Sequence, residues 1–191
     1  MMPVALSLLV SFPSWSADIG KGLAAYERGD YATALREWRP LAEQGDAIAQ
    51  YNLGVMYERG LGVAQDYGQA VKWFHRAAEQ GDADAQTNLG WMYGTGRGVP
   101  QNHGQAVEWY RLAAEQGFAQ AQYNLGVMCG NGRGVVQNYV TAHMWGNIGR
   151  ANGNDIADEL LDALEQLMSK DQIARAQQRA SDCMANQYKN C

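Results

Sequence analysis

Asn88-Leu89-Gly90-Trp91-Met92-Tyr93 is the stretch that decides the fold, because close variants of it stand 36 residues earlier and 36 residues later. The variants are Asn52-Leu53-Gly54-Val55-Met56-Tyr57 and Asn124-Leu125-Gly126-Val127-Met128-Cys129. The copies extend without gaps over residues 47–81, 83–117 and 119–150. A period of this length indicates a repeat architecture, in which each unit buries its apolar face by stacking on its neighbours.

Each repeat contains two amphipathic helices. In the middle repeat, the apolar positions at helical spacing are Ala85, Leu89, Met92 and Tyr93 for the first helix and Ala106, Tyr110, Ala113 and Ala114 for the second. Gly94–Gln101 forms the loop between them, and Gly117 ends the second helix where a left-handed residue is needed. Gly90 lies inside the first helix, where it costs about 1 kcal/mol relative to alanine. We expect the partner helix to approach the backbone there too closely for a side chain.

Further elements of the repeat carry a family resemblance. Gly-x-Gly-Val, Ala-x-x-Trp and Ala-Ala-x-x-Gly follow the Asn-Leu-Gly stretch, as at Gly96–Val99, Ala106–Trp109 and Ala113–Gly117. This pattern resembles the Sel-one-like repeat, a relative of the tetratricopeptide repeat. The preceding segment resembles an ordinary tetratricopeptide unit through Gly22, Tyr26, Gly29-Asp30-Tyr31, Ala34 and Trp38. The resemblance implies an all-α, right-handed superhelical solenoid of antiparallel helix pairs.

The chain divides accordingly into six segments: a leader (1–17), a tetratricopeptide-like repeat (18–45), three Sel-one-like repeats (46–81, 82–117 and 118–150) and a C-terminal helical cap (151–191). In the cap, Ser169 and Gln172 form a capping box that opens the last helix. Ile156, Leu160, Leu161, Leu164, Leu167 and Met168 mark the helix before it.

The first 17 residues carry no charged side chain and contain the apolar run Val4–Val10, followed by Pro13 and small residues. This resembles a secretory signal peptide, and the run is too short to remain as a membrane anchor. The alternative is a frayed apolar helix that packs on the solenoid. We expect export to the periplasm or the medium after removal of the leader.

The chain contains three cysteines, and two of them bear on the expected export. Cys183 and Cys191 lie eight residues apart and could form a disulfide in an oxidising compartment, with two unrelated thiols as the alternative. Cys129 takes the place of Tyr57 and Tyr93 in the earlier repeats, so we expect a buried, unreactive packing residue.

Catalysis and nucleic-acid binding find little support in the sequence. The net charge is −5 and no basic stripe is visible. His75, His103 and His143 lie in different repeats without a second ligand at metal spacing, and no nucleophile lies near a base. Glu79 and Glu115 recur once per repeat, as solvated helix faces do. We therefore expect no catalytic residue, no metal and no cofactor.

The aromatic residues divide into two groups. Trp73, Trp109 and Trp145 lie on second helices and are expected in the core between repeats. In tetratricopeptide-like solenoids the first helices line the concave surface, and the matching positions here are Tyr51, Asn52, Val55, Thr87, Asn88, Trp91, Tyr123, Asn124 and Val127. Aromatic and amide groups in one groove suit an extended peptide or a partner helix. The alternative for the asparagines is a bond to the backbone of the neighbouring repeat.

The sequence thus predicts an exported, monomeric adaptor that binds an unidentified protein or peptide in this groove. Two alternatives remain. Cysteine-rich exported relatives are linked to penicillin binding and β-lactam hydrolysis, although they carry a cysteine pair in each repeat and the repeats here contain only Cys129. The other is a structural protein that self-associates through its solenoid ends.

Overall fold

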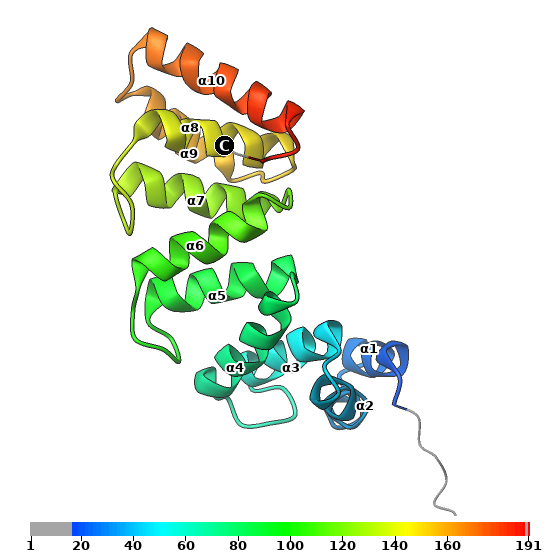
Figure 1. Ribbon diagram of the computed structural model, residues 1–191. Helices are drawn as coiled ribbons and strands as arrows, with labels where there is room; N and C mark the ends of the chain where they lie inside the picture. The colour runs from blue at the N-terminus through cyan, green and yellow to red at the C-terminus, as the bar shows by residue number, and fades with distance from the viewer. Residues whose placement is uncertain (1–16, 190) are drawn as a thin grey trace, which may run out of the picture.

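The computed structural model describes residues 17–189 and 191, so the expected leader lies, apart from Ala17, outside the described residues. The described residues form α-helices stacked one after another in a curved row, with α1 at one end and α10 at the other (Figure 1). No strand is present among them. The helices are α1 (Ile19–Glu27), α2 (Tyr31–Glu43), α3 (Ala47–Arg59), α4 (Tyr67–Glu79), α5 (Ala83–Thr95), α6 (His103–Ala114), α7 (Ala119–Asn131), α8 (Tyr139–Ala151), α9 (Ala157–Glu165) and α10 (Lys170–Ala185).

The helix ends follow local sequence signals. An aspartate or asparagine side chain accepts a hydrogen bond from the third residue of seven helices; these caps are Asp18, Asp30, Asp46, Asp66, Asp82, Asn102 and Asn138. The first helices of the three repeats end at Gly60, Gly96 and Gly132, each in the left-handed conformation. The all-α solenoid expected from the repeats is confirmed.

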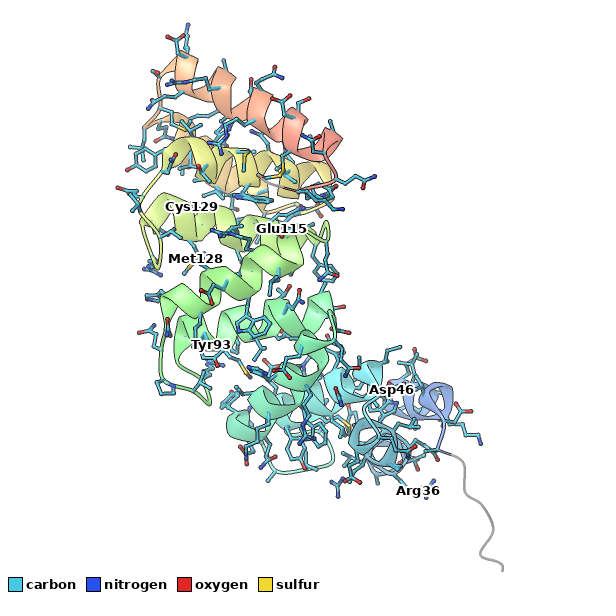
Figure 2. The ribbon with its side chains drawn as sticks, in the orientation of Figure 1. Arg36, Asp46, Tyr93, Glu115, Met128 and Cys129 are labelled. Atoms are coloured by element: carbon cyan, nitrogen blue, oxygen red, sulfur yellow. A yellow bond between two sulfur atoms is a disulfide. The ribbon has the colours of Figure 1, made fainter. Side chains whose placement is uncertain are left out.

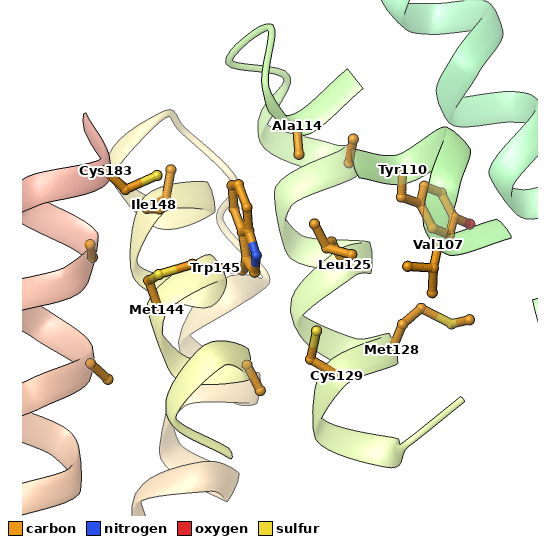
Figure 3. Close-up of a cluster of buried hydrophobic side chains, with 14 of the residues drawn as sticks. Val107, Tyr110, Ala114, Leu125, Met128, Cys129, Met144, Trp145, Ile148 and Cys183 are labelled. Atoms are coloured by element: carbon orange, nitrogen blue, oxygen red, sulfur yellow. The ribbon is translucent and has the colours of Figure 1, made fainter. Parts of the chain in front are cut away.

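The predicted helix faces are buried with one exception. Ala85, Leu89 and Met92 have no exposed surface, and Ala106, Tyr110, Ala113 and Ala114 are buried on α6, whereas Tyr93 is only half-buried. The tryptophan prediction holds for one residue of three. Trp145 is buried and points from α8 toward Leu125 on α7 (Figure 3), whereas Trp73 and Trp109 are only half-buried. The fully buried aromatic ring of α4 is Phe74, one position after Trp73.

The glycines inside the first helices make room for that next aromatic ring. A Cβ on Gly54 would lie 2.5 Å from the Phe74 ring, and one on Gly90 would lie 2.6 Å from the Tyr110 ring. Gly22 faces Trp38 in the same way. The expected approach of the partner helix, too close for a side chain on the glycine, is therefore confirmed, and at these positions an aromatic ring of the partner helix makes the contact.

Gly126 is different, because the residue of α8 that corresponds to the ring is Gly146. A Cβ on Gly126 would lie 3.0 Å from the carbonyl oxygen of Ala142 and 3.3 Å from the nitrogen of Gly146. At this position the two backbones themselves approach closely. Leu160 and Leu161 of α9 border these two glycines, so α9 occupies space that an aromatic ring fills in the other repeats.

The loop of each Sel-one-like repeat contacts the start of the second helix of the preceding repeat. Gly62 lies against Tyr31, Gly98 against the carbonyl group of Tyr67, and Gly134 against that of His103. All three glycines have positive φ angles, between 69° and 73°. The Gly-rich loops thus join consecutive repeats as well as the two helices within one.

The cap closes the C-terminal end of the solenoid. α10 packs along α8 as each first helix packs on the second helix before it, while α9 lies against α8 and α7. The capping box of Ser169 and Gln172 is confirmed: each side chain bonds the backbone nitrogen of the other residue. Ala176, Ala180 and Cys183 are the buried residues of α10.

A disulfide joins Cys183 and Cys191, whose Cα atoms lie 5.4 Å apart, so the pairing considered from the sequence is present. Cys191 also accepts a hydrogen bond from Arg179 through its backbone oxygen. The disulfide and this hydrogen bond together hold Cys191 against α10. Among residues 17–189 and 191, no helix combines the length and the apolar character needed to cross a membrane.

Reduction of this disulfide is expected to lower the free energy of unfolding by about 2.5 kcal/mol, because opening a short loop returns entropy to the unfolded chain. Thermal melts followed by circular dichroism, with and without reductant, measure the effect. The double variant Cys183→Ser/Cys191→Ser is the control, since its melting temperature should not respond to reductant. Superimposable curves for the natural protein under both conditions would contradict the prediction.

Candidate functional site

The nine residues predicted to line a groove lie on α3, α5 and α7, and every one of them is half-buried. A side chain in this state is held in place by its neighbours and still presents surface to a ligand. We call this surface the first-helix face. The structure divides it into two pockets and a packed remainder.

The larger pocket, of about 320 Å³, lies across the middle of the first-helix face. We call it the Trp91 pocket; it is lined by Glu58, Thr87, Asn88, Trp91, Gln120 and Asn124. Four of these residues were predicted from the sequence, and Glu58 and Gln120 were not. The lining comes from three consecutive first helices, so the pocket exists only because the repeats stack.

Arg97 holds one face of Trp91. Its guanidinium carbon lies 4.6 Å from the centre of the Trp91 ring and 5.5 Å from that of Tyr67. Its Nη1 also donates a 3.4 Å hydrogen bond to the Tyr67 hydroxyl. The loop after α5 thereby fixes the indole ring through a cation–π contact.

One carboxylate, that of Glu58, lines the Trp91 pocket, and a second, that of Asp84, lies one helix turn from its lining on α5. Burial raises the pKa of Glu58, opposed by the charges of Arg59 and Arg97. Partial desolvation, followed by repulsion from Asp82, raises the pKa of Asp84, an exposed residue one turn before Asn88 on α5. Burial and then the charge of Asp84 raise the pKa of the Tyr51 hydroxyl. The half-buried carboxylate of Glu58 is incompletely solvated, and none of the side chains that line the Trp91 pocket is cationic.

The second pocket lies where α9 meets the first-helix face and measures about 190 Å³. We call it the Leu160 pocket; it is lined by Val127, Gly130, Asn131, Gln137, Tyr139, Leu160, Ala163, Leu164 and Leu167. Its lining is mainly apolar, and Leu167 is 62% exposed. Val127 follows Asn124 by three residues on α7, so the two pockets adjoin along one face of that helix.

The remaining predicted residues do not line either pocket. Tyr51 packs on the Phe74 ring, with 5.8 Å between ring centres. Asn52, Val55 and Tyr123 contribute surface outside the two linings. Among the asparagines, Asn124 accepts a hydrogen bond from Gln120 on its own helix.

Buried glutamines make the bond between repeats that was considered for the asparagines. Nε2 of Gln86 donates to the carbonyl oxygen of Ala78 at 3.1 Å, and its Oε1 accepts from Gln116 at 2.8 Å. Gln50 and Gln122 make the same bond, to Ala42 and Ala114. The recurrence of glutamine every 36 residues is the sequence signal that identifies this set.

A polar network that starts from the buried His143 ties α9 to α8 and was also missed in the sequence analysis. His143 has no exposed surface; its Nε2 lies 3.1 Å from a carboxylate oxygen of Glu165, and its Nδ1 lies 2.7 Å from the amide nitrogen of Asn147. Arg150 continues the network by donating to Asn147 and Asp158. The network fixes α9, which supplies Leu160, Ala163 and Leu164 to the Leu160 pocket.

The structure also shows the surroundings of the remaining histidine and cysteine side chains considered for catalysis or metal binding. Nδ1 of His75 lies 3.2 Å from a carboxylate oxygen of Glu79, one turn further along α4. Cys129 is buried and unpaired at the position that Tyr93 occupies one repeat earlier (Figure 2), and burial raises the pKa of its thiol. In the described part of the chain, no three His, Cys, Asp or Glu side chains are grouped as metal ligands.

Several solved structures resemble this fold. A Sel1 repeat protein from Oxalobacter formigenes matches with a TM-score of 0.75 and 29% sequence identity, over 87% of this chain and 75% of that chain. The protein c5321, described as a protective antigen present in uropathogenic Escherichia coli strains and displaying an SLR fold, matches with a TM-score of 0.61 and 27% identity. The match spans 88% of this chain and 47% of c5321. No curated protein matches the sequence.

The Sel1 repeat pattern matches three consecutive segments, residues 47–82, 83–118 and 119–154. Together they cover more than half of the chain and coincide with the helix pairs α3–α4, α5–α6 and α7–α8. The chain is therefore a member of the Sel1 repeat family.

Proposed function

We propose that this protein is an exported adaptor that binds a protein or peptide segment on its first-helix face. Sel1 repeat proteins generally serve as scaffolds for protein–protein interaction. The observation that carries the proposal is the Trp91 pocket, in which a tryptophan, three amide side chains and a carboxylate from three helices border one open space.

The composition of this pocket suits a polypeptide ligand. Asn88, Gln120 and Asn124 offer both donors and acceptors, which can pair with the backbone of an extended segment. Trp91 supplies a large ring that Arg97 already holds in position, so little side-chain freedom is lost on binding. Aromatic residues of this kind dominate the energy of many protein interfaces.

The proposal is tested by capture from a bacterial envelope extract, followed by measurement of the affinity for the captured protein. Trp91→Ala is expected to weaken binding about tenfold or more, because loss of an aromatic anchor costs about 2 kcal/mol. The matched control is Trp109→Ala, which removes a half-buried tryptophan from α6, outside both pockets. Melting curves of both variants verify that they fold.

Equal affinity of the Trp91→Ala variant and the natural protein would place the partner elsewhere. An equal loss in the Trp91→Ala and Trp109→Ala variants would show that the effect is not specific to the pocket. Either result contradicts the proposed binding face.

We propose further that the protein acts outside the cytoplasm, without catalysis and as a monomer. Export is supported by the apolar leader sequence and by the Cys183–Cys191 disulfide, a bond that persists in oxidising compartments. Cell fractionation, hydrolysis of a chromogenic β-lactam and light scattering test these three statements. Cytoplasmic retention, hydrolysis that is lost on unfolding, or a mass that rises with concentration would contradict them in turn.

A further inference from the structure

We infer that the segment bound on the first-helix face carries a lysine or arginine for the Trp91 pocket and, a few residues away, an aliphatic side chain for the Leu160 pocket. This inference rests on the proposed function and specifies the chemistry of the partner. It follows from the charge of one pocket, the apolar lining of the other and their adjacency on α7.

The acidic side chains give the first pocket its preference. Glu58 lines it directly, and Asp84 lies one turn from Thr87 and Asn88 on the same face of α5. Asp82 and Asp84 repel one another, and Glu58 is half-buried. A ligand cation would relieve this unfavourable concentration of charge, whereas a carboxylate would add to it.

Arg97 shows that Trp91 accepts a cation. Its guanidinium group lies 4.6 Å from the ring centre, and its charge also acts on Glu58. Arg97 belongs to the loop and does not line the Trp91 pocket. The ring and the carboxylate therefore already interact with one guanidinium group from outside the pocket, and a lysine or arginine of the partner would meet the same two groups from within it.

The Leu160 pocket supplies the apolar anchor site. Leu160, Leu164 and Leu167 form one wall, and Val127 of α7 forms the other. The wall is fixed, because Leu164 is buried and the neighbouring Glu165 bonds His143. An aliphatic side chain placed there would cover Leu167, which is otherwise 62% exposed.

The spacing of the two anchors follows from α7. Asn124 lines the Trp91 pocket and Val127 lines the Leu160 pocket, and three residues of helix rise about 4.5 Å. An extended peptide advances about 3.3 Å per residue. The cationic and the aliphatic residue of the ligand therefore stand within a few positions of each other.

The test uses an acetylated, amidated nonapeptide library, degenerate at every position, retained on the immobilised protein and sequenced against the input. Peptides with lysine or arginine near leucine, isoleucine or valine are expected to be enriched about three- to tenfold. In Glu58→Gln/Asp84→Asn the cationic enrichment should vanish while the aliphatic enrichment stays. Leu167→Ala should give the opposite result.

Matched controls change the same chemistry elsewhere. Glu43→Gln/Glu108→Gln removes two exposed carboxylates from α2 and α6, and Val136→Ala shortens a side chain that is 90% exposed in a loop. Both controls should retain peptides as the natural protein does.

Different results of this experiment would contradict the inferred ligand chemistry and the proposed binding function. Retained peptides that depend on Trp91 but lack cationic enrichment would overturn this inference and leave the proposed function intact. Enrichment of acidic peptides would overturn it as well. A library from which nothing is retained above the bare resin would contradict both.

Discussion

Gly98→Ala is expected to lower the free energy of unfolding by about 3 kcal/mol or more, combining a strained backbone with a steric clash. Gly98 has a φ angle of +73°, and a Cβ there would lie 2.5 Å from the carbonyl carbon of Tyr67 and closer still to its oxygen. The clash is with backbone at the start of α4, so no side-chain rotation relieves it. Urea denaturation followed by circular dichroism measures the loss.

Gly81→Ala is the matched control. Gly81 has a φ angle of +94°, but no atom lies within 4 Å of the position of its Cβ. The Gly81→Ala variant therefore has the backbone strain without a steric clash, which should lower the free energy of unfolding by about 1 kcal/mol. Equal losses for the two variants would show that the loop does not depend on its contact with the preceding repeat.

Gly98 also matters for the site. It follows Arg97, whose guanidinium group is held between Trp91 and Tyr67, and Tyr67 is the same residue that Gly98 approaches. The close contact of the loop with α4 therefore sets where the cation lies on the indole ring. If the added methyl group of the Gly98→Ala variant displaced the loop, Arg97 would move with it and Trp91 would lose its cation–π contact.

The repeat pattern predicted the helices and the buried faces well, because the same local signals recur in every unit. The assignment of Trp73 and Trp109 to the core was less successful. Trp73 and Phe74 are adjacent large aromatic residues on α4, and the orientation of the helix decides which one faces the glycine of α3. A shift of one position along a helix turns a side chain by about 100°, so small differences in orientation exchange the two roles.

The sequence predicted only part of the lining of the two pockets, because some of their residues come together through the packing of different repeats. Thr87, Asn88, Trp91 and Asn124 were predicted from the first-helix positions of the repeats and indeed meet in one pocket. Glu58 and Gln120 join them through the curvature of the stack, which no single repeat encodes. The Leu160 pocket depends on α9 lying beside α7, and α9 is outside the repeat pattern altogether.

Substitution of Tyr110 by alanine is expected to destabilise the protein by about 3–5 kcal/mol and to reverse the effect of a second substitution at Gly90. Tyr110 is buried on α6, and its ring is the group that a Cβ on Gly90 of α5 would meet. In the natural protein Gly90→Ala should cost about 1–2 kcal/mol, because the clash with the ring exceeds the gain in helix propensity. Without the ring the added methyl group meets no such obstacle. Gly90→Ala in the Tyr110→Ala variant should therefore stabilise by up to about 1 kcal/mol.

Gly94→Ala provides the control within the same helix. Its Cβ would lie 3.7 Å from the Cβ of Ala106, which is an ordinary contact, so it should stabilise by up to about 1 kcal/mol with or without Tyr110. A double-mutant cycle from urea denaturation separates the two cases, because only the Gly90–Tyr110 pair should show a coupling energy. Additive effects at Gly90 and Tyr110 would mean that the glycine serves the helix backbone instead of the ring. The sign reversal would establish that in this repeat a ring on the second helix is fitted to a glycine on the first, the arrangement that Gly54 and Phe74 share one repeat earlier.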